Sequence, residues 1–272
     1  MHKPTLKRFT QPLLLLITVL LSACSTMETD PTAEWTAKDF YDEARSSLNA
    51  GEFQTAIKNL ETLEARFPFD PYAKQAQLDV AYAYYKFDEP ESAISAVDRF
   101  MRLHPRDPHI DYAYYLKGLV NFNRGTGFLD DWFPRDLARH DASVMHEAYN
   151  DFSTMIRRYP NSQYAGDAHQ RMIFLRNKMA QKEIQIAEFY IERNSWLSAI
   201  NRAKTVIESY QDSIWSHRAL EIMIESYKNL GLDDLAADVQ SILSMNSPRK
   251  DIQTPSPNNE LDEPPAVAQN IH

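Results

Sequence analysis

The chain has 272 residues, a formal net charge of −9 at pH 7, 43% hydrophobic residues and only six glycines. Its acidic balance argues against nucleic acid or anionic lipid headgroups as the main partner, because both are bound by basic surfaces. The shortage of glycine argues against an all-β chain with many tight turns. The hydrophobic content suffices for one or two ordinary domains or for one longer solenoid.

Residues 1–23 have the three parts of a secretory signal peptide. Three basic residues precede the apolar run Leu13–Leu21, and the small residues Ser22 and Ala23 follow it. The apolar run is too short to span a bilayer as a helix, so we expect export and cleavage. Loss of residues 1–23 leaves 249 residues and changes the formal charge from −9 to −12.

Cys24, the only cysteine, stands directly after these small residues. Small residues followed by cysteine resemble the bacterial lipobox, which implies S-diacylglycerol and N-acyl groups on Cys24 after cleavage. These acyl chains would hold the protein on a membrane, and by resemblance to lipoprotein sorting Ser25 favours the outer membrane. The alternative is an ordinary signal peptide in which the cysteine falls by accident. A single cysteine cannot form an internal disulfide, so stability must come from burial.

An alanine followed twelve residues later by proline recurs along the mature chain. The pairs are Ala56 and Pro68, Ala93 and Pro105, Ala148 and Pro160, and Ala236 and Pro248. A fifth copy has Gln211 twelve residues after Ala199. This spacing is typical of the tetratricopeptide repeat (TPR), in which a small residue lets two helices pack closely and proline ends the second helix. We expect an all-α fold, an α-solenoid of five TPR helix pairs with a concave wall.

The periodicity between these markers predicts ten helices and no strand. We expect them at residues 38–49, 52–66, 72–86, 90–103, 109–122, 142–158, 163–192, 195–210, 213–229 and 232–245. Two repeats are longer than the others, which predicts an inserted loop over 123–141 in the third and a lengthened first helix in the fourth. We expect residues 24–37 to link the lipid to the first helix. The proline-rich tail, 247–272, is expected to be disordered.

The first helix of each pair is expected to line the concave side. Transferring the outward positions of the second repeat to its neighbours gives an aromatic ladder with basic residues beside it. Its members are Tyr41, Arg45, Leu48, Leu78, Tyr82, Tyr85, Lys86, Tyr112, Tyr115, Leu119 and Phe122, with Arg99 nearby. Tyrosine offers a large contact area, few rotatable bonds and one polar tip, so the ladder suits an extended peptide ending in an aromatic residue and a carboxylate. The alternative is that these rings belong to the core.

The carboxyl-terminal half carries basic and aromatic residues together. They are Arg193, Trp196, Arg202, Lys204, Trp215 and Arg218. Charge-assisted hydrogen bonds and anchoring rings of this kind predict an acidic protein partner. Scattered solvated charges are the alternative.

No group of residues has the spacing of a catalytic or metal site. His140 and His146 are six residues apart, roughly 120° out of phase on a helix, so they do not form a helical zinc pair. The acidic residues near Asp130 lack calcium-loop spacing, and no phosphate loop or nucleophile elbow occurs. We therefore expect no enzyme activity, no metal and no cofactor apart from the covalent lipid.

Several strings go beyond the packing positions that any TPR protein shares. They are Arg66-Phe67-Pro68-Phe69-Asp70-Pro71-Tyr72, Gln77-Leu78-Asp79, Tyr82-Ala83-Tyr84-Tyr85-Lys86, Asp98-Arg99-Phe100, Asp151-Phe152, Tyr159-Pro160-Asn161-Ser162-Gln163-Tyr164 and Val206-Ile207-Glu208. Through these strings, residues 38–246 resemble the BamD (ComL) family, the TPR lipoproteins of the outer-membrane β-barrel assembly (BAM) machinery. The proline-rich tail departs from the compact ending of that family.

The resemblance implies a periplasm-facing outer-membrane scaffold that binds the assembly protein BamA, accessory BAM lipoproteins and unfolded outer-membrane proteins. It implies that residues 38–122 engage carboxyl-terminal signals of barrel substrates, with Phe67, Phe69, Asp70 and Arg99 in this half. Residues 142–246 would hold BamA, with Arg202 in that half. A TPR pilotin for a pilus or secretin is the alternative, in which the concave wall would hold one partner segment.

Overall fold

The computed structural model describes residues 30–126 and 142–246. Within these ranges the chain forms ten α-helices and no β-strand. They are α2 (Ala37–Ala50), α3 (Phe53–Arg66), α4 (Pro71–Lys86), α5 (Pro90–Leu103), α6 (Ile110–Thr126), α7 (Ala142–Arg158), α8 (Ala165–Ile191), α9 (Trp196–Ser209), α10 (Ser216–Asn229) and α11 (Asp233–Met245). In this part of the chain, no helix combines the length and apolar character that a membrane span requires.

The observed helix ends agree with the predicted ones within three residues, except at the end of α6. Helix α6 continues to Thr126, so the prediction that the inserted loop begins at residue 123 is wrong. Helix α8 has 27 residues, against 13 to 17 in the other nine described helices, as the long fourth interval predicts. The predicted signal peptide, Cys24, the rest of the inserted loop and the tail lie outside the described residues.

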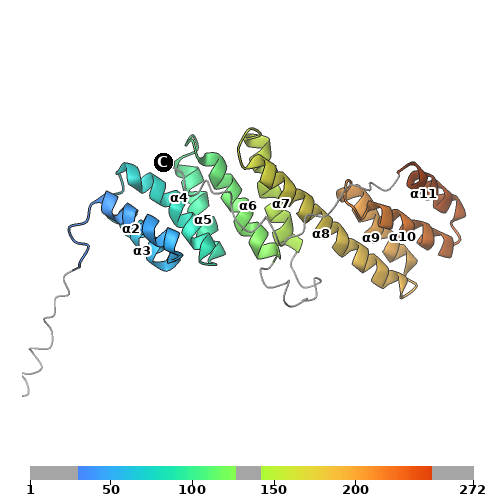
Figure 1. Ribbon diagram of the computed structural model, residues 1–272. Coiled ribbons are helices and arrows are strands. Elements are labelled where there is room, and N and C mark those ends of the chain that lie inside the picture. The colour runs from blue at the N-terminus through green and yellow to red at the C-terminus, as the bar shows by residue number, and fades with distance from the viewer. Residues whose placement is uncertain (1–29, 127–141, 247–272) are drawn as a thin grey trace, which may run out of the picture.

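The helices form a row of hairpins from α2 at one end to α11 at the other (Figure 1). Each helix packs against its neighbour in the chain, and the main contacts between alternate helices join only α2, α4, α6, α8 and α10. We call these five helices the inner layer and α3, α5, α7, α9 and α11 the outer layer. Because inner-layer helices lie closer together, the row curves toward them, as in a TPR-like solenoid.

Four turns that lead from an outer helix to the next inner helix share one side-chain hydrogen bond. In each, an Asp or Ser side chain accepts a hydrogen bond of 2.9 to 3.2 Å from the main-chain N–H two residues later. The donor–acceptor pairs are Tyr72 and Asp70, His109 and Asp107, Tyr164 and Ser162, and Trp215 and Ser213. In α4 this bond caps the helix, because Tyr72 is its second residue, whereas in the other three the donor directly precedes the helix. Side chains of this kind favour a tight turn, so the same turn leads into four inner helices.

Four turns inside the hairpins contain a residue with left-handed backbone. Gly51, Asp88, Asn194 and Gly231 have φ values of 76°, 60°, 54° and 71°. The next main-chain N–H in each case donates to a carbonyl five residues earlier, which is the Schellman ending of a helix. Asp and Asn are among the few residues other than glycine that adopt this conformation readily. The remaining hairpin, α6 to α7, carries residues 127–141 at this position.

The alanines that mark the repeat lie where the two helices of each hairpin meet. All five are at most 2% exposed. One core cluster runs from α2 to α10, and a smaller one, formed by Leu220, Ile224 and Val239, joins α10 to α11. Gly118 has a similar role in α6, because a Cβ atom there would meet the Phe152 ring at 2.6 Å.

Candidate interaction surfaces

The inner layer carries five predicted peptide-binding residues on α2 and α4, which we call the tyrosine face: Tyr41, Arg45, Tyr82, Tyr85 and Lys86. The Tyr41 hydroxyl donates to Asp79 Oδ2 at 3.0 Å, and Gln75 Nε2 donates to Oδ1 at 3.0 Å. Arg45 Nη1 lies 3.8 Å from the same carboxylate. Burial raises the pKa of Asp79, although Arg45 and the two hydrogen bonds oppose this change. Asp79 thus holds the α2 residues against α4.

Tyr82 and Tyr85 lie one helical turn apart on α4, with ring centroids separated by 6.3 Å. Both side chains are half-buried, and Asn123 Nδ2 donates to the Tyr85 hydroxyl at 2.7 Å. Lys86, at the end of the same helix, is exposed. The face therefore presents partly open rings beside positive charge.

The prediction that Tyr112 and Tyr115 lie on an open surface is wrong, since they are 2% and 0% exposed. The Tyr115 ring stacks on Tyr164 at 4.8 Å, and its hydroxyl donates to Asp167 at 2.6 Å. Leu119 and Phe122, expected on the same side, are also buried, as is Leu78 on α4. The start of α8 covers these positions of α6, so the aromatic ladder ends at α4.

Arg171 completes this buried contact between α6 and α8. Its side chain is 1% exposed, its Nε donates to Asp167 at 2.6 Å, and its guanidinium lies 4.9 Å from the centre of the Phe122 ring. A buried guanidinium needs such partners because leaving it unpaired would be costly. The sequence reasoning missed this cluster, although Asp167 and Arg171 have the spacing of an i,i+4 helix pair.

The four residues placed in the substrate half by resemblance have different surroundings. The ring centroids of Phe67 and Phe40 lie 6.3 Å apart, and Asp70 caps α4. Arg99 lies on outer helix α5, where its two terminal nitrogens donate to Glu64 at 2.6 and 2.7 Å. Phe69 differs from these three, because it is 99% exposed.

The predicted partner-binding residues lie around α8, α9 and α10. Arg202 pairs with Glu183 at 3.2 Å, and Arg218 pairs with Glu188 at 2.9 Å. Arg193 lies over the Phe189 ring, 3.5 Å from its centre, while Trp196 is half-buried at the start of α9. Each of the three arginines thus has a partner within the chain, so their charge is shared with neighbouring groups.

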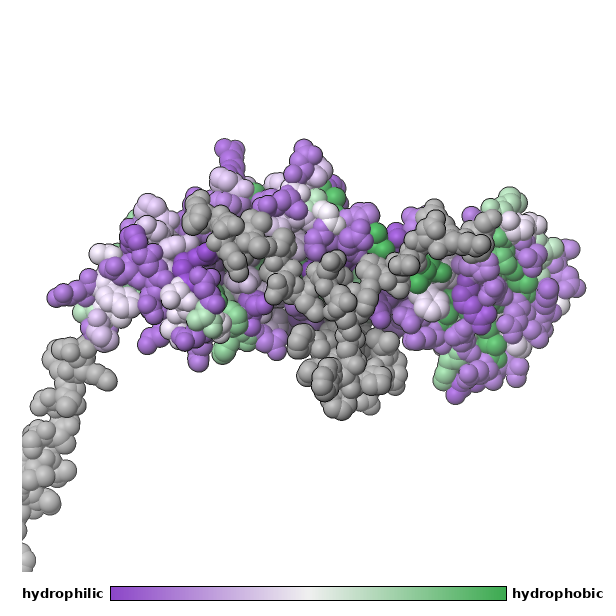
Figure 2. Space-filling view, in the orientation of Figure 1, coloured by the Kyte–Doolittle hydropathy of each residue, from purple (hydrophilic) through white to green (hydrophobic). Residues whose placement is uncertain are grey.

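An apolar surface at this end was missed by the sequence reasoning. Figure 2 shows hydrophobic residues gathered where α9 to α11 lie. On α11, Leu235, Ile242 and Met245 are 44%, 47% and 77% exposed. Terminal repeats of solenoids usually have a polar outer face, so an apolar one points to a partner. The sequence does contain a signal for this surface, because apolar residues occur on two sides of α11 and a helix that packs on one side needs them on only one.

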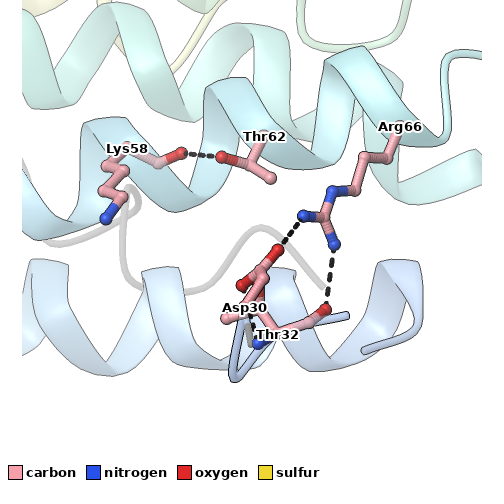
Figure 3. Close-up of polar contacts among 5 residues, drawn as sticks. All are labelled: Asp30, Thr32, Lys58, Thr62 and Arg66. Atoms are coloured by element: carbon pink, nitrogen blue, oxygen red, sulfur yellow. Dashed lines mark hydrogen bonds and ion pairs between the residues drawn. The ribbon is translucent and has the colours of Figure 1, made fainter. Parts of the chain in front are cut away.

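A shallow hollow of about 440 Å³ lies on outer helix α3 and not on the inner layer. It is lined by Gln54, Ile57, Lys58, Glu61, Thr62, Ala65 and Arg66. Figure 3 shows that Arg66, at one end of the hollow, reaches Asp30 and Thr32 in the segment before α2. The segment that leads toward Cys24 is therefore attached to α3.

Residues 30–126 and 142–246 contain no group of three His, Cys, Asp or Glu side chains placed to hold a metal ion. The polar clusters described above join helices to one another. They do not bring a nucleophile, a base and an orienting group together in a cavity.

The chain is similar to known proteins over most of its length. A family model described as outer membrane lipoprotein, YfiO, matches residues 33–242. The "Outer membrane protein assembly factor BamD" of Neisseria gonorrhoeae is 41% identical over 239 residues, which cover 86% of this chain and 90% of that protein. The protein of the same name from Vibrio cholerae is 36% identical over 232 residues, covering 85% and 96% of the two chains. The crystal structure of MamA protein matches with a TM-score of 0.36 and 16% identity, covering 81% of this chain and 98% of that one.

The two relatives and the family model agree over nearly the whole described region. The resemblance inferred from the strings between residues 38 and 246 is thereby confirmed. The chain belongs to the YfiO/BamD family of outer membrane lipoproteins.

Proposed function

We propose that this protein is a lipid-anchored, periplasm-facing scaffold of the BAM complex at the outer membrane, and that it acts by binding other polypeptides without catalysing a reaction. Its membership of the family and the name of its relatives support this role. The ten described helices correspond to five TPR pairs, with an insertion between α6 and α7 and a long α8. Covalent lipid on Cys24 supplies the membrane attachment.

The tyrosine face is the proposed site for segments of unfolded outer-membrane proteins. The observation that carries this assignment is the set of half-buried rings on α2 and α4, beside Arg45 and Lys86. Rings can stack on an aromatic residue of a barrel strand, and a cation can bind its terminal carboxylate. Residues 38–122 therefore form the substrate half.

Residues 142–246 form the proposed half for BamA and accessory BAM lipoproteins. The apolar surface of α11 supports this assignment, because a partner would remove it from water. The arginines at 193, 202 and 218, which lie against α8, and Trp196 at the start of α9 would contact the same partner. Exposed charges at an interface guide orientation and association more than they add affinity.

A photocrosslinking experiment tests the substrate half. A photoreactive residue at Tyr82 should capture a carboxyl-terminal barrel peptide, and a scrambled peptide should be captured less. Tyr84 is the matched control, because its hydroxyl bonds to Glu61 on the outer helix α3. Equal capture of both peptides at position 82, or equal capture at 82 and 84, would count against the assignment.

Two substitutions test the anchor and the partner half. Cys24→Ser should release the protein from membranes, and persistent membrane association with lipid incorporation would contradict the anchor. Arg202→Glu should reduce co-purification with BamA, whereas Arg99→Glu, at a similarly exposed ion pair outside this half, should leave it unchanged. Unaltered co-purification of the Arg202 variant would argue against the partner assignment.

A further inference from the structure

The segment before α2 is attached to the end of α3. Arg66 Nη1 donates to the Thr32 carbonyl at 2.9 Å, and its guanidinium also pairs with Asp30 (Figure 3). Hydrogen bonds from Thr32, and then from Arg66, lower the pKa of Asp30 to about 2, so this carboxylate stays charged in the pair. The described chain therefore begins beside the last turn of α3.

The start of α2 adds two further contacts. The Trp35 and Phe40 rings lie 5.0 Å apart, and Thr36 and Asp39 cap each other's main chain. A capping box with an apolar contact across it fixes the direction in which the chain enters a helix. These contacts therefore fix the direction in which the segment before α2 enters the solenoid.

Cys24 precedes Asp30 by six residues. Six residues span at most about 20 Å even when fully extended. If Cys24 carries lipid, as the proposed function holds, the end of α3 must lie within about that distance of the membrane surface. The further inference rests on this anchor.

Phe69 lies in the turn that directly follows α3. Its side chain is 99% exposed, and the neighbouring Pro68 and Pro71 are exposed too. Asp70 caps α4 and Phe67 packs on the core, so the turn is fixed on both sides of the ring. Prolines further restrict its backbone. The ring projects from the body of the protein, whereas peptide and ligand sites are usually concave.

The next turn along the same edge, from α5 to α6, has similar chemistry. Leu103 is 59% exposed, and Arg102 and Arg106 are exposed. Lys74, at the start of α4, reaches this turn by pairing with Asp107 at 2.7 Å and remains 50% exposed. We call Phe69, Lys74, Arg102, Leu103 and Arg106 the turn edge.

The acidic residues of these two turns are already engaged. Asp70 caps its helix, and the Asp107 side chain is 3% exposed between Lys74 and His109. The turn edge therefore combines apolar side chains with cations, although the whole chain is acidic. This combination is typical of surfaces that lie on anionic lipid.

We propose that the turn edge contacts the membrane leaflet that carries the anchor, with the Phe69 ring entering the boundary between headgroups and acyl chains. One ring and three cations bind a membrane weakly by themselves. The tether keeps them at a high effective concentration near the surface, so a weak contact suffices. It would hold the solenoid at a defined orientation beneath the membrane.

The single cysteine allows a direct test that does not depend on lipidation in cells. The mature chain, residues 24–272, is coupled through Cys24 to a maleimide lipid in vesicles of phosphatidylethanolamine and phosphatidylglycerol. Phe69→Trp and Phe87→Trp are compared, each adding one tryptophan to the same background. Phe87 is the matched control, because it is 40% exposed at the opposite edge, in the turn from α4 to α5.

Brominated lipids should quench the added tryptophan at position 69 at least about twofold more than the one at 87. Arg102→Gln with Arg106→Gln should reduce that excess, because anionic headgroups would lose two cations. Equal quenching at 69 and 87 would overturn the proposal, even if Cys24→Ser shows the anchor to be real. A second result would also overturn the proposal: in Phe69→Trp, lipid does not quench the added tryptophan, but barrel peptide without lipid changes its emission. That result would assign this position to peptide binding.

Discussion

The hydroxyl of Tyr41 on α2 donates a hydrogen bond of 3.0 Å to the buried carboxylate of Asp79 on α4. This bond joins two inner-layer helices that are separated in the chain by α3. Gln75 and Arg45 lie at the same carboxylate. Asp79 therefore belongs both to the packing of the solenoid and to the support of the tyrosine face.

The Asp79 carboxyl should give stability an unusual pH dependence. Burial raises its folded pKa above the ordinary value of 3.8, so the folded chain binds the proton more tightly than the unfolded chain does. Its contribution to stability is then largest below about pH 4 and is lost as pH rises through the folded pKa. Urea unfolding should show that the difference in unfolding free energy between the natural protein and Asp79→Asn falls as pH rises. A difference that grows with pH would contradict this prediction.

Asp107 should behave in the opposite way. Burial alone would raise its pKa, but hydrogen bonds from Lys74 and the His109 main chain lower it below the ordinary value of 3.8. Its contribution to stability is present above about pH 4 and is lost as pH falls through the folded pKa. The difference between the natural protein and Asp107→Asn should therefore shrink on acidification in the same urea titration. A constant difference would show that these hydrogen bonds do not favour the ionised form.

Tyr115→Phe should lower the free energy of unfolding by about 2 kcal/mol, because a buried hydroxyl loses its bond to a charged group. The lost bond is the one to Asp167, at 2.6 Å. Tyr112→Phe is the matched control, since the Tyr112 hydroxyl is buried with no hydrogen-bond partner among the described residues. Its removal should change stability by less than about 0.5 kcal/mol. Similar losses in the two variants would mean that the Tyr115 bond is not what stabilises the α6–α8 contact.

Gly118→Ala should destabilise the protein by about 1 to 3 kcal/mol through overpacking. The new methyl group would meet the Phe152 ring at 2.6 Å, between α6 and α7. Gly166→Ala, in α8, has open space around the added methyl group and should leave stability unchanged or raise it by up to about 1 kcal/mol. Thermal unfolding of both variants checks the pair. If Gly118→Ala did not change stability, α6 and α7 would be able to move apart without a loss of free energy.

The sequence could predict the ten helices because their ends carry local signals. Pro71 and Pro90 stand at helix starts, Gly51 and Gly231 stand at helix ends, and buried alanines recur between them. The end of α6 could not be predicted in this way. There the Asn123 side chain bonds to Tyr85 on another helix, so the helix continues for a tertiary reason.

The tyrosine face could be predicted only where a neighbour does not cover it. The repeat register places Tyr82 and Tyr112 on one open surface, yet Tyr82 is half-buried and Tyr112 is 2% exposed. The difference arises from Tyr164, whose ring lies 5.4 Å from Tyr112 at the start of α8. Exposure depends on the next hairpin, which an offset within one repeat does not describe.

Two arginines of the substrate half should have separable effects. Arg99 is held by Glu64 through two hydrogen bonds, whereas Arg45 lies on the tyrosine face beside Asp79. Because the Arg99 pair is partly exposed, Arg99→Ala should lower the unfolding free energy by only about 1 kcal/mol. It should leave the capture of barrel peptide at position 82 unchanged.

Arg45→Ala should weaken binding of the same peptide by about tenfold, because a charge-assisted hydrogen bond to its carboxylate is lost. An amidated peptide is the control, since it lacks that carboxylate and should bind both variants and the natural protein equally weakly. Titration of a fluorescent peptide measures the affinities, and urea unfolding measures stability in parallel. If Arg99→Ala weakened peptide binding as much as Arg45→Ala while both variants stayed folded, the peptide would have to reach the outer layer. The tyrosine face alone would then not account for recognition.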